Sequence, residues 1–170
     1  RASRQDIRVS LEWTREQLDD QALDGLRQRP AIIDADGFQV IHASHAVKPT
    51  WLYVLDENSA LLNFLFQEAY LTFNGHTHLP LSASHYTNRP VRMDYLRGGV
   101  LHSEQCQYLI GIGAVGQPRD NDPRSSAVIY DNEARHVELL RIPYDIEAAQ
   151  KAIRDADLPA FLADRLEVGQ

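Results

Sequence analysis

Apolar and polar positions follow a helical period near the ends of the chain and a strand period through much of its middle. Alternation over residues 9–13 predicts a short extended segment. Thr14 followed by Gln17 fits a capping box, so a helix is expected to begin there. Pro30 should end this helix because its ring is incompatible with a helix interior.

The next elements are expected to be a hairpin, a helix and a buried strand. The apolar runs 31–33 and 38–41 flank Asp34-Ala35-Asp36-Gly37, which is typical of a hairpin turn with solvent-facing carboxylates. Residues 58–69 have a helical period, and residues 70–73 predict a strand that ends at Asn74-Gly75. The expected apolar side of this helix consists of Leu61, Leu62, Leu65 and Ala69.

The second half of the chain is expected to be strand-rich and to end in two helices. Strands are predicted at residues 91–96, 99–104, 108–112, 126–130 and 136–142. Asp145 is a candidate N-cap, Pro159 opens the last helix, and Gly169 follows its end. Because neither a repeat nor a linker divides the chain, one α/β domain spanning residues 1–170 is predicted.

Composition narrows the class of protein. The 170 residues are 44% apolar and carry a net charge of −7, which suits a globular domain and argues against a nucleic-acid scaffold role. No apolar run reaches the roughly 20 residues that cross a bilayer. The single cysteine, Cys106, favours a reducing compartment, so a cytoplasmic location is expected. The chain begins at Arg1 and its one methionine is Met93, so we expect it to be part of something longer.

Histidines carry most of the chemical information. His76 and His78 follow an apolar strand, and on extended backbone residues i and i+2 point to the same side, so both imidazoles could reach one metal. His42 ends another apolar run and could approach from a neighbouring strand, with His45 close enough to line the same opening. Spacing alone leaves a second interpretation open, in which His76 and His78 are a hydrogen-bonded pair that binds no metal.

Three motifs and the tail together resemble a known family. The motifs are Val40-Ile41-His42-Ala43-Ser44, Gly75-His76-Thr77-His78-Leu79-Pro80 and Val115-Gly116-Gln117-Pro118-Arg119. The tail contains Arg141-Ile142-Pro143-Tyr144-Asp145-Ile146 and then Leu158-Pro159. In this order they resemble the calcineurin-like metallophosphoesterases, and within them a bacterial group of predicted phosphodiesterases.

The resemblance implies a fold, a reaction and a set of ligands. The implied fold is the C-terminal part of a four-layer α/β/β/α sandwich, and the implied reaction is metal-dependent hydrolysis of a small phosphate ester, by a phosphodiesterase or phosphatase. His42 and His76 would hold the second of two divalent metal ions and His78 the first. Imidazole ligands suit Mn, Fe, Zn, Co or Ni better than Mg.

Other family motifs do not occur in this sequence. The Asp-x-His, Gly-Asp-x-x-Asp and Gly-Asn-His motifs, which supply the bridging carboxylate and the general-acid histidine, are missing from the 170 residues. We therefore expect no catalytic residue in this chain and no activity from it alone. The chain also departs from the family inside the matched segments, at Ala43, His45, Gly111, Ile112 and Ala114.

Alternatives to the enzyme hypothesis remain at this point. One is a non-catalytic interaction or regulatory module that retains the sheet, and another is a mononuclear zinc site held by three histidines and a water. Arg119 is either a phosphate contact or part of a salt bridge to Asp120 or Asp122 that fixes its loop. His45 is a second candidate for contact with substrate.

Overall fold

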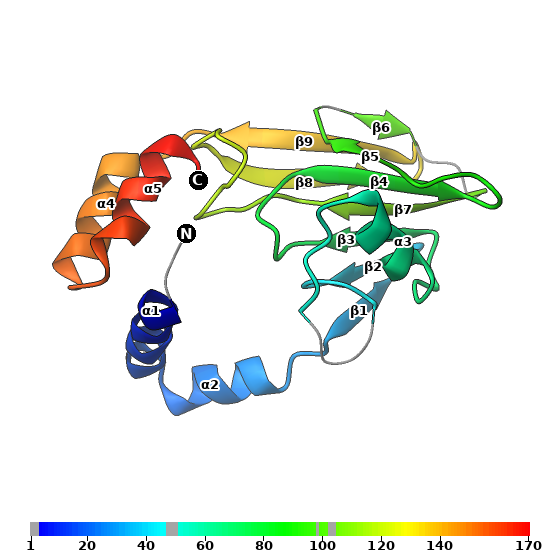
Figure 1. Ribbon diagram of the computed structural model, residues 1–170. Coiled ribbons are helices and arrows are strands. Elements are labelled where there is room, and N and C mark those ends of the chain that lie inside the picture. Colours follow the sequence, from blue (N-terminus) through cyan, green and yellow to red (C-terminus); the bar gives the residue numbers. More distant parts are fainter. Residues whose placement is uncertain (1–3, 47–50, 98, 102–104) are drawn as a thin grey trace.

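Two β-sheets packed face to face form the centre of the structure, a computed structural model that describes residues 4–46, 51–97, 99–101 and 105–170 (Figure 1). In order across the larger sheet, the strands are β1 (Ile32–Ala35), β2 (Phe38–Ile41), β3 (Leu71–Asn74), β7 (Cys106–Gly111), β4 (Leu81–Tyr86) and β5 (Arg92–Tyr95). The smaller sheet contains β6 (Val100–Leu101), β9 (His136–Ile142) and β8 (Ser125–Asp131). The expected mixed α/β class is therefore confirmed.

The main core lies between the two sheets. Phe73 of β3 and Ile110 of β7 face Val137 of β9, and all three side chains are buried. Phe38 and Tyr130 extend this core with an edge-on ring contact at 5.6 Å between centroids. Since apolar burial contributes roughly 25 cal/mol per Å², this layer is the main source of stability that joins the sheets.

Helix α3 (Glu57–Phe64) covers the other face of the larger sheet. Asp56 caps it in a capping box with Ser59, and Ala60 and Phe64 pack with Ala83 and Leu109 of the sheet. The expected apolar side of this helix is wrong, because the leucines face solvent and Leu65 is 70% exposed. Buried Asn63 takes an inward position instead, since its amide has hydrogen-bond partners there.

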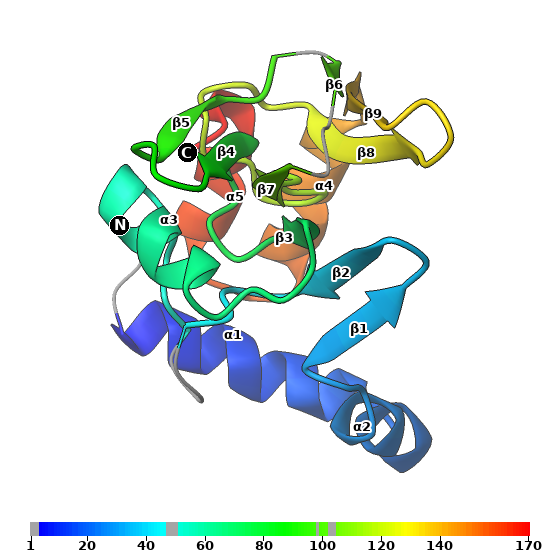
Figure 2. The same ribbon diagram turned by 90° about the vertical axis from the view of Figure 1, so that its right-hand side faces the viewer.

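The N-terminal segment also differs from its prediction. Residues 9–13 are helical rather than extended, within α1 (Arg4–Gln17), and a second helix, α2 (Asp20–Arg27), begins after a break. The cap is Asp19, whose carboxylate accepts from the Ala22 amide, and Thr14 donates to a carbonyl inside α1. Figures 1 and 2 show both helices standing apart from the sheets, and α2 has no buried residue. No helix in the described part of the chain is long and apolar enough to cross a membrane.

The two C-terminal helices agree with the sequence signals. Helix α4 (Ile146–Asp155) is capped by Asp145, and α5 (Ala160–Val168) follows Pro159 and ends at Gly169 in the left-handed conformation. Inside the pair, the buried Gln150 amide donates to the Ala163 carbonyl at 3.0 Å.

Most strand predictions are confirmed, including the antiparallel hairpin of β1 and β2. The strand expected at 99–104 is present as β6, and residues 102–104 lie outside the described residues. Strand β4 was missed because its sequence, Leu-Ser-Ala-Ser-His-Tyr, is weakly apolar. It pairs with both β5 and β7, so its place in the sheet is decided by its neighbours.

A cluster of charges ties the loop before β8 to strand β9. Arg141 of β9 pairs with Asp120 and lies 3.7 Å from Asp122, which also pairs with Arg124 at 2.6 Å. Hydrogen bonds from Arg124 are the main cause that lowers the pKa of Asp122 to about 2.

We predict that this cluster makes stability depend on acid pH. A carboxylate with a depressed pKa stabilises the fold fully above its unfolded pKa of about 4, and the contribution is lost as pH falls toward about 2. Asp122→Asn should therefore lower the free energy of unfolding at pH 7 by about 1 kcal/mol or less, since the pair is partly exposed. In urea titrations the difference from the parent should shrink between pH 4 and pH 2, whereas Asp36→Asn in the exposed hairpin turn should show no such trend.

A second prediction concerns the core between the sheets. Ile110 is 0% exposed, so Ile110→Ala should reduce the free energy of unfolding by about 2–5 kcal/mol. Ile129→Ala on β8 is the matched control, because that side chain is 53% exposed and should change stability by less than about 1 kcal/mol. Equal losses in urea unfolding would contradict the assigned core.

Candidate metal centre

Three parallel strands end at one edge of the larger sheet. Strand β2 pairs parallel with β3, and β3 with β7, so that Ile41, Asn74 and Gly111 are aligned. The pairing continues one step further, because the Gly75 amide donates to the His42 carbonyl at 3.0 Å and the Ile112 amide to the Asn74 carbonyl at 2.9 Å. The histidines that follow β2 and β3 are therefore fixed at the same edge, where sheet enzymes usually build their sites.

His42 and His76 are in direct contact. Nε2 of His42 lies 3.2 Å from Nδ1 of His76, and Nε2 of His76 lies 3.1 Å from the Trp51 carbonyl oxygen. A carbonyl oxygen only accepts, so Nε2 of His76 carries the hydrogen, and Nδ1 of His76 accepts a hydrogen bond from Nε2 of His42. The tautomer of His76 is thus set by the backbone of Trp51.

The segment that carries His76 and His78 is not extended, which corrects the geometry expected from the His-x-His spacing. Both residues have positive φ angles, 62° and 61°, in the left-handed region. Between them buried Thr77 closes the turn, since its amide donates to the Gly75 carbonyl and its hydroxyl accepts from the Leu79 amide. The two imidazoles consequently have different partners rather than the same one.

His78 faces the loop that precedes β8. Its Nδ1 lies 2.7 Å from the Gln117 carbonyl oxygen and so carries the hydrogen, which leaves Nε2 as the atom with a lone pair. Burial is the main cause that lowers the pKa of His78, and the charges of Arg119 and Arg165 lower it further. Burial likewise lowers the pKa of His76, with smaller effects from His42 and Arg119. A lowered pKa favours the neutral form of both rings, which is the form that binds metals.

The spacing of the His42 and His76 nitrogens fits a shared cation. Two imidazole nitrogens bound to one ion at about 2.0–2.1 Å, about 90–110° apart, lie about 2.8–3.4 Å from each other. The observed 3.2 Å falls in that range. Within the described residues, however, no group of three or more His, Cys, Asp or Glu side chains is placed to hold a metal ion. His78 is thus not brought into a three-ligand cluster with the other two.

Two arginines meet beside His78. The side-chain oxygen of Gln117 accepts from Arg119 and from Arg165, each at 3.0 Å, and the Arg119 amide donates to the His78 carbonyl. The expected salt bridge of Arg119 to its neighbours is not the arrangement observed, because Asp120 and Asp122 pair with Arg141 and Arg124. The Arg119 Nε atom is buried without a hydrogen-bond partner in the described chain.

Arg165 was not identified from the sequence. It lies on α5, far from every motif, and only the docking of that helix brings it to Gln117. Arg119 and Arg165 together place two positive charges next to His78.

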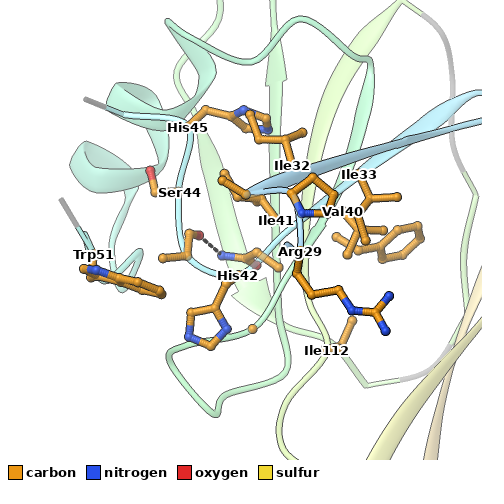
Figure 3. Close-up of a pocket in the computed structure, with 16 residues that line it drawn as sticks. Arg29, Ile32, Ile33, Val40, Ile41, His42, Ser44, His45, Trp51 and Ile112 are labelled. Atoms are coloured by element: carbon orange, nitrogen blue, oxygen red, sulfur yellow. Dashed lines mark hydrogen bonds between the residues drawn. The ribbon is translucent and has the colours of Figure 1, made fainter. Parts of the chain in front are cut away.

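His45 lies away from the His42–His76 pair. Its ring nitrogen Nε2 is 3.3 Å from the Thr72 hydroxyl, and its amide donates to the side chain of buried Asn63. Burial lowers the pKa of His45, and Glu68 and Asp34 oppose the shift. Figure 3 shows His45 and His42 at different ends of the groove that they both line.

That groove is mostly apolar and has a volume of about 740 Å³. Its walls come from the β1–β2 hairpin, the start of the loop after β2 and the ends of β3 and β7 (Figure 3). Apolar residues from three strands line it, including Ile32, Val40 and Phe73, together with Ile112 just after β7. His42 and Trp51 line it too, so the groove opens directly beside the histidine pair.

Three of the positions that depart from the family pattern, Ala43, Gly111 and Ala114, lie in closely packed or hydrogen-bonded surroundings. A side chain at Gly111 would place its Cβ 2.8 Å from the Leu79 carbonyl oxygen, so only glycine fits. Ala114 exchanges hydrogen bonds with Ser126 of β8, whose hydroxyl also fills the space beside Gly113. Ala43 is buried, and its carbonyl accepts from the Asn74 amide. The loop that contains Gly113 and Ala114 is therefore held by Ser126.

Comparisons with known proteins give the chain its relatives. It is 31% identical over 166 residues to the uncharacterized protein MJ0912 of Methanocaldococcus jannaschii, covering 95% of this chain and 65% of that protein. A crystal structure of a metallophosphoesterase from Sphaerobacter thermophilus matches with a TM-score of 0.82 and 34% identity, covering 94% of this chain and 65% of that one. The chain thus spans about two thirds of the length of the relatives it matches.

A more distant structure shares the fold alone. It is a hypothetical protein, PH1004, from Pyrococcus horikoshii OT3, with a TM-score of 0.66, 15% identity, and coverage of 91% of this chain and 57% of that one. No known family profile matches the chain.

We predict that the left-handed turn is strained by its histidines. A non-glycine residue in this conformation costs roughly 1–2 kcal/mol, so His78→Gly should be more stable than His78→Ala by about 1 kcal/mol. Both variants lose the bond to Gln117, and their difference in urea unfolding isolates the backbone. The same pair at His85 in strand β4 should give the opposite order, since glycine weakens a strand by about 0.5–1 kcal/mol.

Proposed function

Because the chain belongs to the calcineurin-like metallophosphoesterase superfamily by fold and by sequence similarity, we propose that the intact protein hydrolyses a phosphate ester with bound divalent metal ions. In this proposal the chain supplies His42, His76 and His78 as ligands. The observation that carries it is the contact between His42 and His76, with 3.2 Å between two ring nitrogens and a tautomer fixed by the Trp51 carbonyl.

The donor set supports a metal role for each histidine. Metal-binding imidazoles usually donate their second ring nitrogen to a carbonyl or carboxylate, which fixes the tautomer of the ligand. His76 donates in this way to Trp51, and His78 to Gln117. Once it gives up the hydrogen that it donates to His76, His42 would present Nε2 to an ion shared with Nδ1 of His76. His78 would present Nε2 to the other ion.

Divalent ions in such a centre make water nucleophilic at neutral pH and neutralise charge that develops on a phosphoryl group. Arg119 is proposed to contact the phosphate, because it lies beside His78 and its buried Nε is a donor without a partner in the described chain. Arg165 supports that role by sharing the Gln117 acceptor. His45, turned toward Thr72, is proposed only to line the groove.

The chain's own ligands are neutral, which limits what it does alone. Three imidazoles do not offset the charge of two divalent ions, so a dinuclear centre also needs carboxylates. We propose that these come from the part of the intact protein that corresponds to the unmatched third of the relatives.

Metal binding tests the proposal directly. Titration of the chain with Co²⁺, followed by visible absorbance and calorimetry, should reveal a weak site, and His76→Ala should lower its affinity about tenfold or more. His85→Ala is the matched control, because His85 stacks on Phe64 outside the centre. Binding that is unaffected by loss of His76, or no binding at all, would contradict the metal role and favour a non-catalytic module.

Turnover tests the incompleteness of the site. With Mn²⁺ added, the 170-residue chain should not hydrolyse 4-nitrophenyl phosphate above the rate of a His42→Ala/His76→Ala variant. Turnover that depends on these histidines would show that the chain is sufficient for catalysis. Elemental analysis complements the assay, since one zinc per chain would favour a mononuclear site.

A further inference from the structure

Two aromatic side chains flank the His42–His76 pair. The Trp51 ring meets the ring of His42 edge-on, with centroids 5.0 Å apart, and lies 5.7 Å from that of His76. Tyr53 stacks on His76 at 4.1 Å with an interplanar angle of 28°. The pair is thus bordered on one side by a wall of π systems, which we call the aromatic rim, consisting of Trp51 and Tyr53.

The aromatic rim is exposed even though its position is fixed. Trp51 is 64% exposed and Tyr53 is 44% exposed. The backbone beneath them is held at both ends, because the Trp51 carbonyl accepts from His76 and the next apolar residue, Val54, is buried against Ala60 and Phe64 of α3. The rings are therefore presented by an anchored segment.

The exposure of Trp51 beside the histidine pair is relevant to ligand binding. Burying a large aromatic side chain contributes substantially to stability, so one that stays accessible next to a site is a candidate for contact with a ligand. Trp51 also lines the apolar groove that opens beside His42. A ligand whose charged end sits at the histidines would place its apolar end against this ring.

We propose that the aromatic rim binds a planar aromatic group of the substrate, so that the preferred phosphate esters carry a nucleobase or an aryl ring. The inference rests on the proposed function, because it takes the histidine centre as the place of the phosphate. Stacking on an aromatic side chain is worth about 1–3 kcal/mol per base and tolerates different rings, since every such ring has a π face. A planar ester should then bind about 5–150 times more tightly than its ring-free counterpart.

Fluorescence provides a direct measurement, because the chain has only two tryptophans. In a Trp13→Phe background Trp51 is the sole tryptophan, and a ring stacked on it should quench the tryptophan emission. AMP is compared with ribose 5-phosphate, and phenyl phosphate with glycerol 2-phosphate, each with and without Mn²⁺. We expect quenching and tighter binding for AMP and phenyl phosphate, and the better of the two identifies the ring.

Substitutions assign the preference to the rim. Both Trp51→Leu and Tyr53→Leu should bring the ratio of AMP to ribose 5-phosphate affinity close to one. Binding to Trp51→Leu is measured by calorimetry, because this variant lacks the fluorescent tryptophan. Tyr95→Leu on β5, also an exposed tyrosine, is the matched control and should retain the parent ratio. A ratio near one in the parent, a ratio unchanged in both rim variants, or no binding of either ester would overturn the inference.

The two proposals fail in different ways. If Mn²⁺ does not change the affinity for ribose 5-phosphate but AMP still binds more tightly, the metal centre is contradicted and the aromatic rim is supported. If Mn²⁺ raises the affinity for ribose 5-phosphate but AMP binds no more tightly, the metal centre is supported and the aromatic rim is contradicted.

Discussion

The parallel pairing of β2, β3 and β7 is the constraint on which the site depends. Parallel strands place their carboxyl ends at one edge, and here the ladder continues through the His42 carbonyl and the Gly75 amide. Buried Asn74 adds a side-chain bond to the Ala43 carbonyl, so the loops after β2 and β3 are joined beyond the last strand residue. The backbones of His42 and Gly75 are therefore held next to each other, so that the side chains of His42 and His76 can meet at 3.2 Å.

The left-handed turn after β3 distributes the histidines over two partners. An extended segment would direct His76 and His78 to the same side, whereas two positive φ angles around buried Thr77 direct one to Trp51 and the other to Gln117. In a non-glycine residue this conformation costs free energy that the surroundings must offset. The strain is consistent with two imidazoles that serve neighbouring positions.

Signals of short range predicted much of this fold. The caps at Asp145 and Gly169 and the turn at Gly37 depend on a few adjacent residues, and the structure has each of them. Predictions failed where tertiary packing decides: the α3 leucines were expected inside, but Asn63 and Gln67 are inside because their amides satisfy carbonyls and each other. The histidines could be selected from the sequence because they stand in short local motifs. Their tautomers and the approach of Arg165 could not, because both depend on tertiary packing.

Local charge at the centre is opposite in sign to that of the whole chain. The chain carries −7, but the loop carboxylates Asp120 and Asp122 are paired with arginines, and the charges beside His78 are those of Arg119 and Arg165. The positive charges of Arg119 and Arg165 repel a bare divalent cation and attract an anion. Neutral imidazoles next to two guanidiniums therefore make a surface suited to a phosphate group, on which metal ions become stable only when additional carboxylates approach. Under the proposed function, this division of charge lets one edge of the sheet contribute histidine ligands and attract the phosphate, while carboxylates from elsewhere complete the centre.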